Sequence, residues 1–131
     1  MTKTITIWKE KQKFKSFHDH NTIDIDGEKK DGFGSKALLL SAVAACSGID
    51  IVEILQKMRI DFSDFEIETH ADQTENHPRV FKDIFITYKI KTDKKNEAKV
   101  KKAVSLSLEK YCGVSAMLKK NSAIHCDVKI L

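Results

Sequence analysis

Apolar residues run almost without interruption through residues 35–58, which read SKALLLSAVAACSGIDIVEILQKM. From Ala37 to Cys46 this stretch holds no charge and a single hydroxyl. A surface helix would confine its apolar residues to one stripe, so we expect a long central helix that is buried on most of its faces. Charged residues bracket an apolar run shorter than the roughly 20 residues needed to cross a bilayer, which argues against a membrane span.

Alternating polar and apolar residues before this stretch predict three short strands. They lie at residues 4–8 (TITIW), 14–17 (FKSF) and 21–25 (NTIDI), and Asp26-Gly27 supplies a turn after the third. The segment that follows, GEKKDGFGS, is a glycine-rich loop. It lacks the spacing and the lysine of a phosphate-binding loop, so we expect no nucleotide site there.

Two further alternating segments follow the central helix. Residues 65–68 alternate apolar side chains with glutamates, and residues 84–91 form the clearest strand pattern in the chain. A polar loop at residues 71–79 separates the two segments, so they should pair as a hairpin. The chain ends on AIHCDVKIL, which places these residues on one strand face: Ile124, Cys126, Val128 and Ile130.

Between the hairpin and the last strand, residues 94–111 adopt a helical period. The apolar side chains that recur on one side are Val100, Ala103, Val104, Leu108 and Tyr111. Cys112 continues this stripe, Gly113 interrupts it, and residues 114–120 predict a short second helix. No repeat or linker divides the chain, so the pattern predicts a single α+β domain over residues 1–131.

Composition and charge narrow the classes of function. The chain carries a net charge of +4, but lysine supplies nearly all of the basic charge, because the only arginines are Arg59 and Arg79. Nucleic-acid readers use clustered, arginine-rich faces, so lysines scattered among 19 acidic residues argue against a nucleic-acid partner. The N-terminus lacks an apolar signal core, and three cysteines without a CxxC pair do not make a secreted disulfide framework. We expect a cytoplasmic protein with no nucleic-acid or membrane partner.

The three cysteines differ in their surroundings. A lone thiol on a buried helix, such as that of Cys46, is commonly inert core, and Cys126, in line with three aliphatic residues, is expected to be a buried structural thiol. Cys112 lies at a helix junction near Lys110, where the free N–H groups of the next helix would favour a thiolate. The cysteines and histidines show no zinc-ligand spacing, so we expect no metal and no cofactor.

Three segments together resemble a known family. They are the glycine-rich loop followed by ALLLSAVAACSGIDIVEILQKMR, the hairpin sequence NHPRVFKDIFITYKI, and the helix that ends in LSLEKYCGVSAML. From about Ile23 onward the chain is similar to the OsmC/Ohr superfamily, and most closely to its small OsmC-like proteins with the ending EKYCGVSAML. The resemblance implies an OsmC-like fold, with antiparallel sheets around a long central helix, assembled as an intertwined homodimer.

The resemblance also implies a thiol-dependent peroxidase that acts on organic hydroperoxides. In such members the cysteine of the central helix attacks the peroxide, a second cysteine resolves the resulting sulfenic acid as a transient disulfide, and a thiol reductant restores both. On this chain the two positions are Cys46 and Cys112. They should therefore lie within disulfide reach of each other.

The chain departs from the family's peroxidase pattern at two supporting positions. The peroxidases carry an arginine on an early strand, but no arginine precedes Arg59 here, so the role is either empty or filled by a lysine such as Lys13 or Lys15. They also carry a glutamate near the start of the central helix, where this chain has Lys36 or Ala37.

Four residues are candidates for supporting the thiols: Lys36, Asp50, Arg79 and Glu109. Asp50, one turn beyond Cys46, would raise the pKa of that thiol by like-charge repulsion. Arg79, on the hairpin loop, would reach the site of the partner chain in a dimer.

Two other functions stay open beside the peroxidase. One is a non-catalytic OsmC-like domain that binds a small apolar ligand in the same pocket, which the missing arginine and glutamate favour. The other is a redox sensor whose disulfide changes the binding of a partner. The retained pair of cysteines favours the enzyme, which would consume peroxide over many turnovers.

Overall fold

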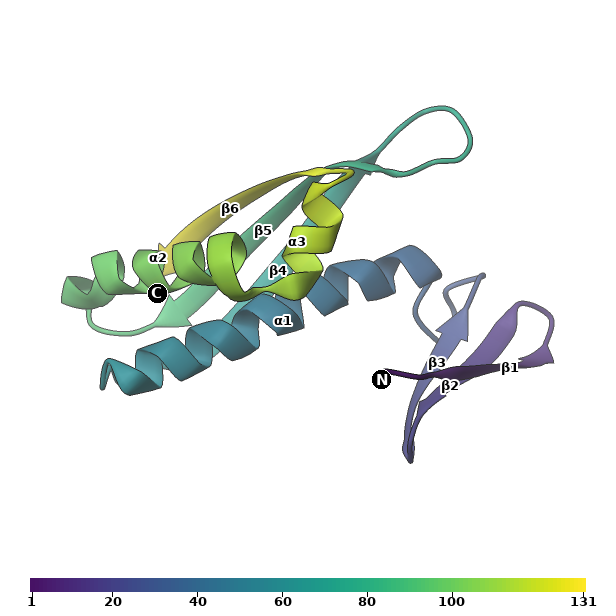
Figure 1. Ribbon diagram of the computed structural model, residues 1–131, viewed down its shortest axis with the longest axis horizontal. Helices are drawn as coiled ribbons and strands as arrows, with labels where there is room; N and C mark the ends of the chain where they lie inside the picture. The colour runs from purple at the N-terminus through teal and green to yellow at the C-terminus, as the bar shows by residue number, and fades with distance from the viewer. The chain divides into compact units, whose positions relative to one another are not determined.

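A computed structural model describes residues 1–131 of the chain. Its contacts divide the chain into two compact units, Met1–Leu39 and Leu40–Leu131 (Figure 1). The long helix α1 (Ser35–Lys57) begins in the first unit and continues through the second. Its bounds agree with the helix expected over residues 35–58.

The first unit is a three-stranded antiparallel sheet, as the alternating pattern predicted. Its strands are β1 (Ile5–Glu10), β2 (Lys13–His18) and β3 (Asn21–Asp26), in the order β1-β2-β3. Apolar side chains of this sheet stay open to solvent in the single chain; Ile5 is 52% exposed and Trp8 is 61% exposed.

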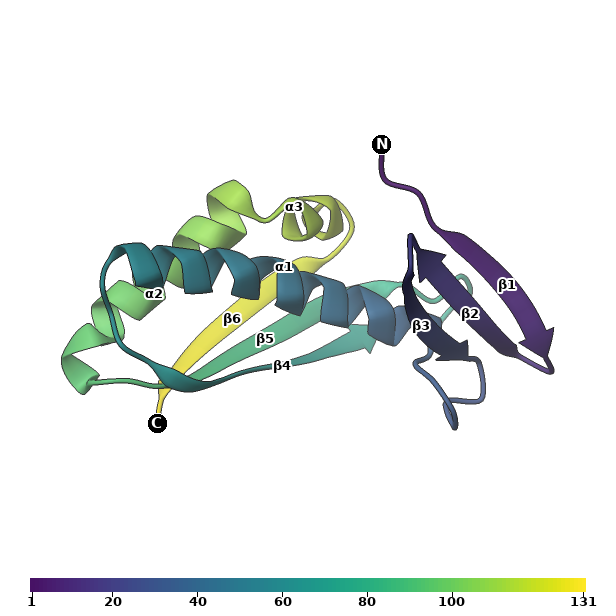
Figure 2. The same ribbon diagram turned by 90° about the horizontal axis from the view of Figure 1, so that it is seen from below.

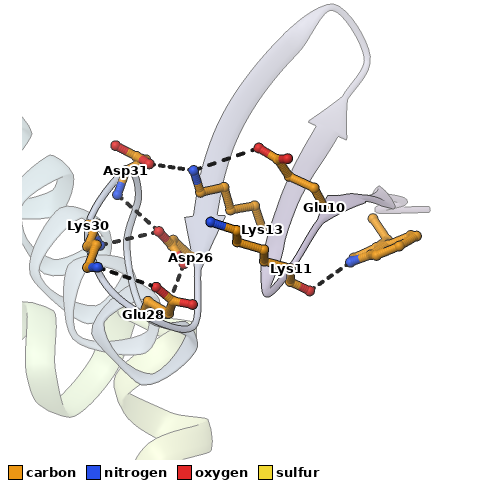
Figure 3. Close-up of polar contacts among 8 residues, drawn as sticks. Glu10, Lys11, Lys13, Asp26, Glu28, Lys30 and Asp31 are labelled. Carbon is orange, nitrogen blue, oxygen red and sulfur yellow. Dashed lines mark hydrogen bonds and ion pairs between the residues drawn. The ribbon is translucent and has the colours of Figure 1, made fainter.

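Asp26 organises the glycine-rich loop that follows β3. Its side chain is 1% exposed and accepts backbone N–H groups from Glu28 at 2.9 Å, Lys30 at 3.3 Å and Asp31 at 3.1 Å (Figure 3). These N–H groups, that of Asp31 foremost, hold the pKa of the Asp26 carboxyl below its ordinary value. The loop is therefore tied to the charged form of one aspartate, and it ends where α1 begins.

The second unit contains a sheet of three strands in the order β4-β5-β6. Strands β4 (Ser63–Gln73) and β5 (Phe81–Lys91) pair as the expected antiparallel hairpin. Strand β6 (Ala123–Ile130), however, runs parallel to β5, so the expectation of purely antiparallel sheets is wrong for this pair. The reason is topological, since a helical crossover between two strands returns the chain to the end of the sheet where the first strand began.

The crossover between β5 and β6 is mostly helical. After a short 3₁₀ turn at Lys94–Asn96 come α2 (Glu97–Leu106), a π-helical turn (Ser107–Tyr111, η2) and α3 (Gly113–Lys119). The sequence predicted two helices here. It did not predict that the first would end in a π-helical turn.

The core of the second unit lies between the sheet and its helices, which Figure 2 shows on one side of the sheet. Four fully buried residues of β5 face this core: Ile84, Ile86, Tyr88 and Ile90. From α1 the stripe Val43, Ile51 and Leu55 packs against them. Gly48 lets the helix approach closely, because a Cβ there would lie 2.8 Å from Cδ1 of Ile67.

Burial of α1 is narrower than the sequence predicted. In the single chain one stripe of the helix is buried, whereas Leu39 is 45% exposed and Ile49 is 67% exposed. The expectation of burial on most faces is therefore wrong for one chain, because the sheet covers one side of the helix only. By length and composition α1 would be apolar enough to cross a membrane. However, the stripe of α1 that is buried against the sheet is typical of a core helix.

Candidate thiol site

Cys46 lies on α1 next to the buried stripe and is partly buried itself. Burial raises the pKa of its thiol above the ordinary value. The backbone N–H of Val114 acts in the opposite direction, while the neighbouring thiol of Cys112 and the carboxylate of Asp50 raise the pKa further. The Asp50 effect has the sign that the sequence predicted.

Cys112 is 3% exposed and forms the N-cap of α3. Its Sγ accepts the backbone N–H of Ser115 at 3.3 Å, so the expectation of free helix N–H groups at this thiol is confirmed. Its own N–H donates to the carbonyl of Ser107 at 2.7 Å, which closes the π-helical turn. The cap and the turn together fix the backbone on both sides of the thiol.

The structure thus brings two free thiols together at the start of α3. Val114 N–H acts on one sulfur and Ser115 N–H on the other. Two backbone dipoles aimed at sulfur stabilise a developing thiolate without a side-chain cation. Lys110, two residues before Cys112, holds its ammonium 5.7 Å from the ring centre of Tyr111.

Side-chain hydrogen bonds fasten this thiol pair to the core. Tyr88 Oη donates to Ser47 Oγ at 2.8 Å, which ties the sheet to α1 beside Cys46. Ser107 Oγ donates to Oδ2 of Asp50 at 2.8 Å, which ties the π-helical turn to α1. The sequence patterns did not single out Ser47 and Ser107, although a hydroxyl at an apolar position of a helical stripe is a signal of such a role.

An open cavity adjoins the site between α1 and the π-helical turn. Its volume is about 600 Å³, and its walls include Asp50, Ile54, Met58, Leu106 and Tyr111. The walls also carry a second carboxylate, Glu53, and the ammonium of Lys57, so a ligand in this cavity would meet both apolar and charged groups. The cavity meets the thiol pair through Asp50, which borders both.

The other candidate supporting residues lie elsewhere. Arg79 is exposed on the loop between β4 and β5, and Lys36 is exposed in the first turn of α1. Glu109 lines a different pocket, with Cys126 and Lys119. Of the four candidates, Asp50 is the one that acts on the pKa of Cys46.

Lys13 and Lys15, the candidates for the role of the missing arginine, each pair with a carboxylate in the first unit. Lys13 Nζ lies 2.6 Å from Oδ2 of Asp31, and this pairing raises the pKa of Lys13 (Figure 3). Lys15 Nζ lies 3.6 Å from Oδ1 of Asp24. Both ammonium groups already have carboxylate partners in this unit.

Cys126 corrects a prediction. The sequence placed it in the core with Ile124 and Val128, but it is exposed, in a pocket of about 360 Å³ beside α2 and α3. Partial desolvation by the pocket walls, and then the carboxylate of Asp127, raise the pKa of its thiol. Strand β6 is an edge strand, and the helices do not close over its middle. No group of three or more histidine, cysteine, aspartate or glutamate side chains is arranged to hold a metal ion.

Comparison with known proteins shows the family of the chain. The family model described as OsmC-like protein matches residues 26–127. The chain belongs to the OsmC-like family. Among its relatives, Protein YhfA of Escherichia coli (strain K12) is 39% identical over 97 residues, which cover 73% of this chain and 72% of YhfA.

Solved structures of other proteins share the fold of this chain. A hypothetical protein from Aquifex aeolicus VF5 is 30% identical, with a TM-score of 0.84 over 100% of this chain and 98% of that one. The organic hydroperoxide resistance protein OhrB of Bacillus subtilis, 20% identical, aligns over 98% of both chains with a TM-score of 0.66. The α+β OsmC-like fold and the resemblance to the OsmC/Ohr superfamily are therefore confirmed.

Proposed function

We propose that this OsmC-like protein is a thiol-dependent hydroperoxide reductase in which Cys46 attacks and Cys112 resolves. The observation that carries the proposal is the shared environment of the two thiols, with a backbone N–H acting on each sulfur. The fold shared with OhrB, whose name records organic hydroperoxide resistance, supports the same reading. A cysteine on a buried helix that had neither a second thiol nor these donors beside it would be interpreted as an inert core residue.

The proposed chemistry balances with an organic hydroperoxide and a dithiol. The Cys46 thiolate attacks the outer peroxide oxygen, the O–O bond breaks, and the alkoxide leaves and takes up a proton as alcohol. The sulfenic acid of Cys46 then condenses with the Cys112 thiol, which forms the disulfide and releases water. An external dithiol reduces the disulfide and is itself oxidised to a disulfide.

No arginine contributes to the thiolate in this proposal. Val114 N–H is the main group that favours the ionised form of Cys46, against burial and the Asp50 carboxylate. Losing one well-aimed donor at a reacting centre typically costs about a hundredfold in rate. The enzyme should accordingly be slower than OsmC/Ohr peroxidases with the full cysteine, arginine and glutamate set, and more active at alkaline pH.

The proposed assembly is a cytoplasmic homodimer without nucleic-acid or membrane partners. Apolar side chains that one chain leaves open, such as Ile49 on α1 and Trp8 on β1, supply surface for a second copy. Light scattering at micromolar concentration should give twice the mass of one chain. Ile49→Asp should shift this mass toward the monomer, and a wild-type monomer would exclude the dimer.

The experiment for activity is hydroperoxide consumption over many turnovers. Purified protein with dithiothreitol and cumene hydroperoxide should consume several equivalents of peroxide. Cys46→Ser should abolish the reaction, whereas Cys126→Ser, the matched change at the third thiol, should leave it intact. Activity in Cys46→Ser would contradict the assignment.

A second function, the binding of a small apolar molecule without catalysis, is favoured by one observation. Four of the residues that line the cavity beside the thiols are Ile54, Met58, Leu106 and Tyr111, which offer apolar contact, while the Cys46 thiol lacks a cationic partner. A wild-type protein that consumes no peroxide beyond one equivalent, yet binds such molecules in this cavity, would support this function. A redox sensor would likewise stop after one equivalent, with the disulfide formed and retained.

A further inference from the structure

We propose that Ser107 and Asp50 form a positioning link that holds the turn carrying Cys112 against the turn of α1 carrying Cys46, and so sets how readily the two thiols pair. The inference deepens the proposed function, because the resolving step of that reaction is the pairing of these thiols. It assigns a role to two residues that touch neither sulfur.

The link reaches from the π-helical turn to α1. Ser107 Oγ lies 2.8 Å from Oδ2 of Asp50 and 3.4 Å from the carbonyl of Ser47. A hydroxyl has one proton, so the shorter contact is the hydrogen bond. Its acceptor is a carboxylate, and such charge-assisted bonds are about twice as strong as neutral ones.

The same residue holds Cys112 through its backbone. Ser107 O accepts the N–H of Cys112 at 2.7 Å across the π-helical turn. The carbonyl of Ser107 thus fixes Cys112, while its hydroxyl fixes Ser107 to the helix of Cys46. Breaking the hydroxyl contact frees the Cys112 turn from α1 and leaves the turn itself closed.

Ser47 of α1 donates its hydroxyl proton within its own helix, to the carbonyl of Val43 at 2.9 Å, and its oxygen accepts from Tyr88 Oη. Ser107 is equally buried, but it donates its hydroxyl proton to another element, at a residue one turn from Cys46. A serine that served only to end its own helix would not need this partner.

The pairing step can be measured without hydroperoxide. Oxidised glutathione accepts one protein thiolate to form a mixed disulfide and releases one glutathione; the second protein thiolate then displaces the other glutathione and closes the Cys46–Cys112 disulfide. Closure depends on how well the two thiols are held together. Every protein compared in this assay carries Cys126→Ser, including the one called wild type, so that only this pair reacts.

Ser107→Ala should lower the equilibrium constant for pairing by about tenfold against wild type, in buffers of reduced and oxidised glutathione. Ser107→Thr keeps the hydroxyl and should restore pairing to within about twofold. Ser105→Ala, on an exposed position of α2, is the matched control and should pair like wild type. After one equivalent of cumene hydroperoxide, Ser107→Ala should also yield more dimedone-trapped sulfenic acid than wild type.

Asp50 supplies a second pair of variants in case Ser107→Ala does not fold. Asp50→Asn keeps an acceptor for the serine hydroxyl, while Asp50→Ala removes it, and both lose the charge. The proposal requires Asp50→Ala to pair about tenfold less readily than Asp50→Asn. Equal pairing in these two would overturn it.

The outcomes separate this inference from the proposed function. If wild type pairs its thiols and Ser107→Ala pairs equally or more readily, the link is refuted and the peroxidase survives. If wild type consumes no hydroperoxide but its pairing depends on the link as stated, the peroxidase is refuted and the link stands. If wild type does not pair Cys46 with Cys112 at all, both the link and the proposed peroxidase mechanism are refuted.

Discussion

Tyr88 Oη donates a hydrogen bond to Ser47 Oγ at 2.8 Å, and this contact joins the middle of the sheet to α1 one residue from Cys46. Both side chains are fully buried. The Ser47 hydroxyl in turn donates to the carbonyl of Val43, so no polar atom in this group is left without a partner. This contact from the core strand β5 therefore helps to fix how close the turn of α1 that carries Cys46 lies to the sheet.

Tyr88→Phe should lower the free energy of unfolding by about 1 kcal/mol, the usual net contribution of one neutral hydrogen bond. The loss stays modest because the Ser47 hydroxyl keeps its bond to Val43. Urea unfolding measures the change, with Tyr111→Phe at an exposed ring as the control. A loss above about 3 kcal/mol would indicate that the hydroxyl supports more than this contact.

Stability should fall steeply at alkaline pH. Burial raises the pKa of Tyr88 to about 12. Because the folded pKa lies above the unfolded value of about 10, the unfolded chain releases this proton first. The group's contribution is complete below pH 10 and is lost as the pH rises toward 12. Unfolding followed between pH 9 and pH 12 should give a smaller slope for Tyr88→Phe than for wild type.

Cys46 should become reactive at a higher pH than an ordinary cysteine does. Burial, the Cys112 thiol and Asp50 together raise the pKa of Cys46, so its thiolate is scarce at neutral pH and its alkylation by iodoacetamide should be slower than that of a free cysteine. Asp50→Asn removes one of the causes and should speed alkylation at pH 7 several-fold. Glu53→Gln, an exposed change of charge on the same helix, should leave the rate unchanged. Rapid wild-type alkylation at pH 6 would show that Val114 N–H outweighs burial.

The sequence predicted elements better than it predicted contacts between them. The run of residues 35–58 and the alternation of β4 and β5 each follow from a local period. The bounds of α1 and β5 agree with the prediction within a few residues, whereas β4 continues to Gln73, into the segment predicted as a loop. The pairing of Asp50 with Ser107 joins positions 57 residues apart. It depends on how two helices pack, which no local period encodes.

The error at Cys126 has a physical cause of the same kind. Alternation correctly assigned it to the face of β6 that carries Ile124 and Val128. Which part of that face is covered depends on where α2 and α3 cross the edge strand, and they leave a pocket at Cys126. Cys46 and Cys112 were predicted to be neighbours from the family resemblance together with their places on apolar stripes, and the two thiols do act on each other.

Asp26→Asn should destabilise the N-terminal sheet in a way that depends on acid. The backbone N–H groups of Asp31, Glu28 and Lys30 hold the pKa of Asp26 below its ordinary value. For a carboxyl whose folded pKa is depressed, the contribution to stability is present above the unfolded pKa and is lost as the pH falls through the folded pKa. The amide cannot offer the same charge to three donors, so the variant should melt at a lower temperature than wild type at pH 7.

The difference between Asp26→Asn and wild type should shrink as the pH falls below about 4, where the wild-type carboxyl begins to lose its advantage. Asp24→Asn, at an exposed aspartate of the same strand, should show a far smaller change at either pH, because its partner is the surface ammonium of Lys15. Thermal unfolding followed by circular dichroism at pH 7 and pH 3 measures both variants. A gap for Asp26→Asn that persists undiminished at pH 3 would mean that the loop depends on the shape of this side chain rather than on its charge.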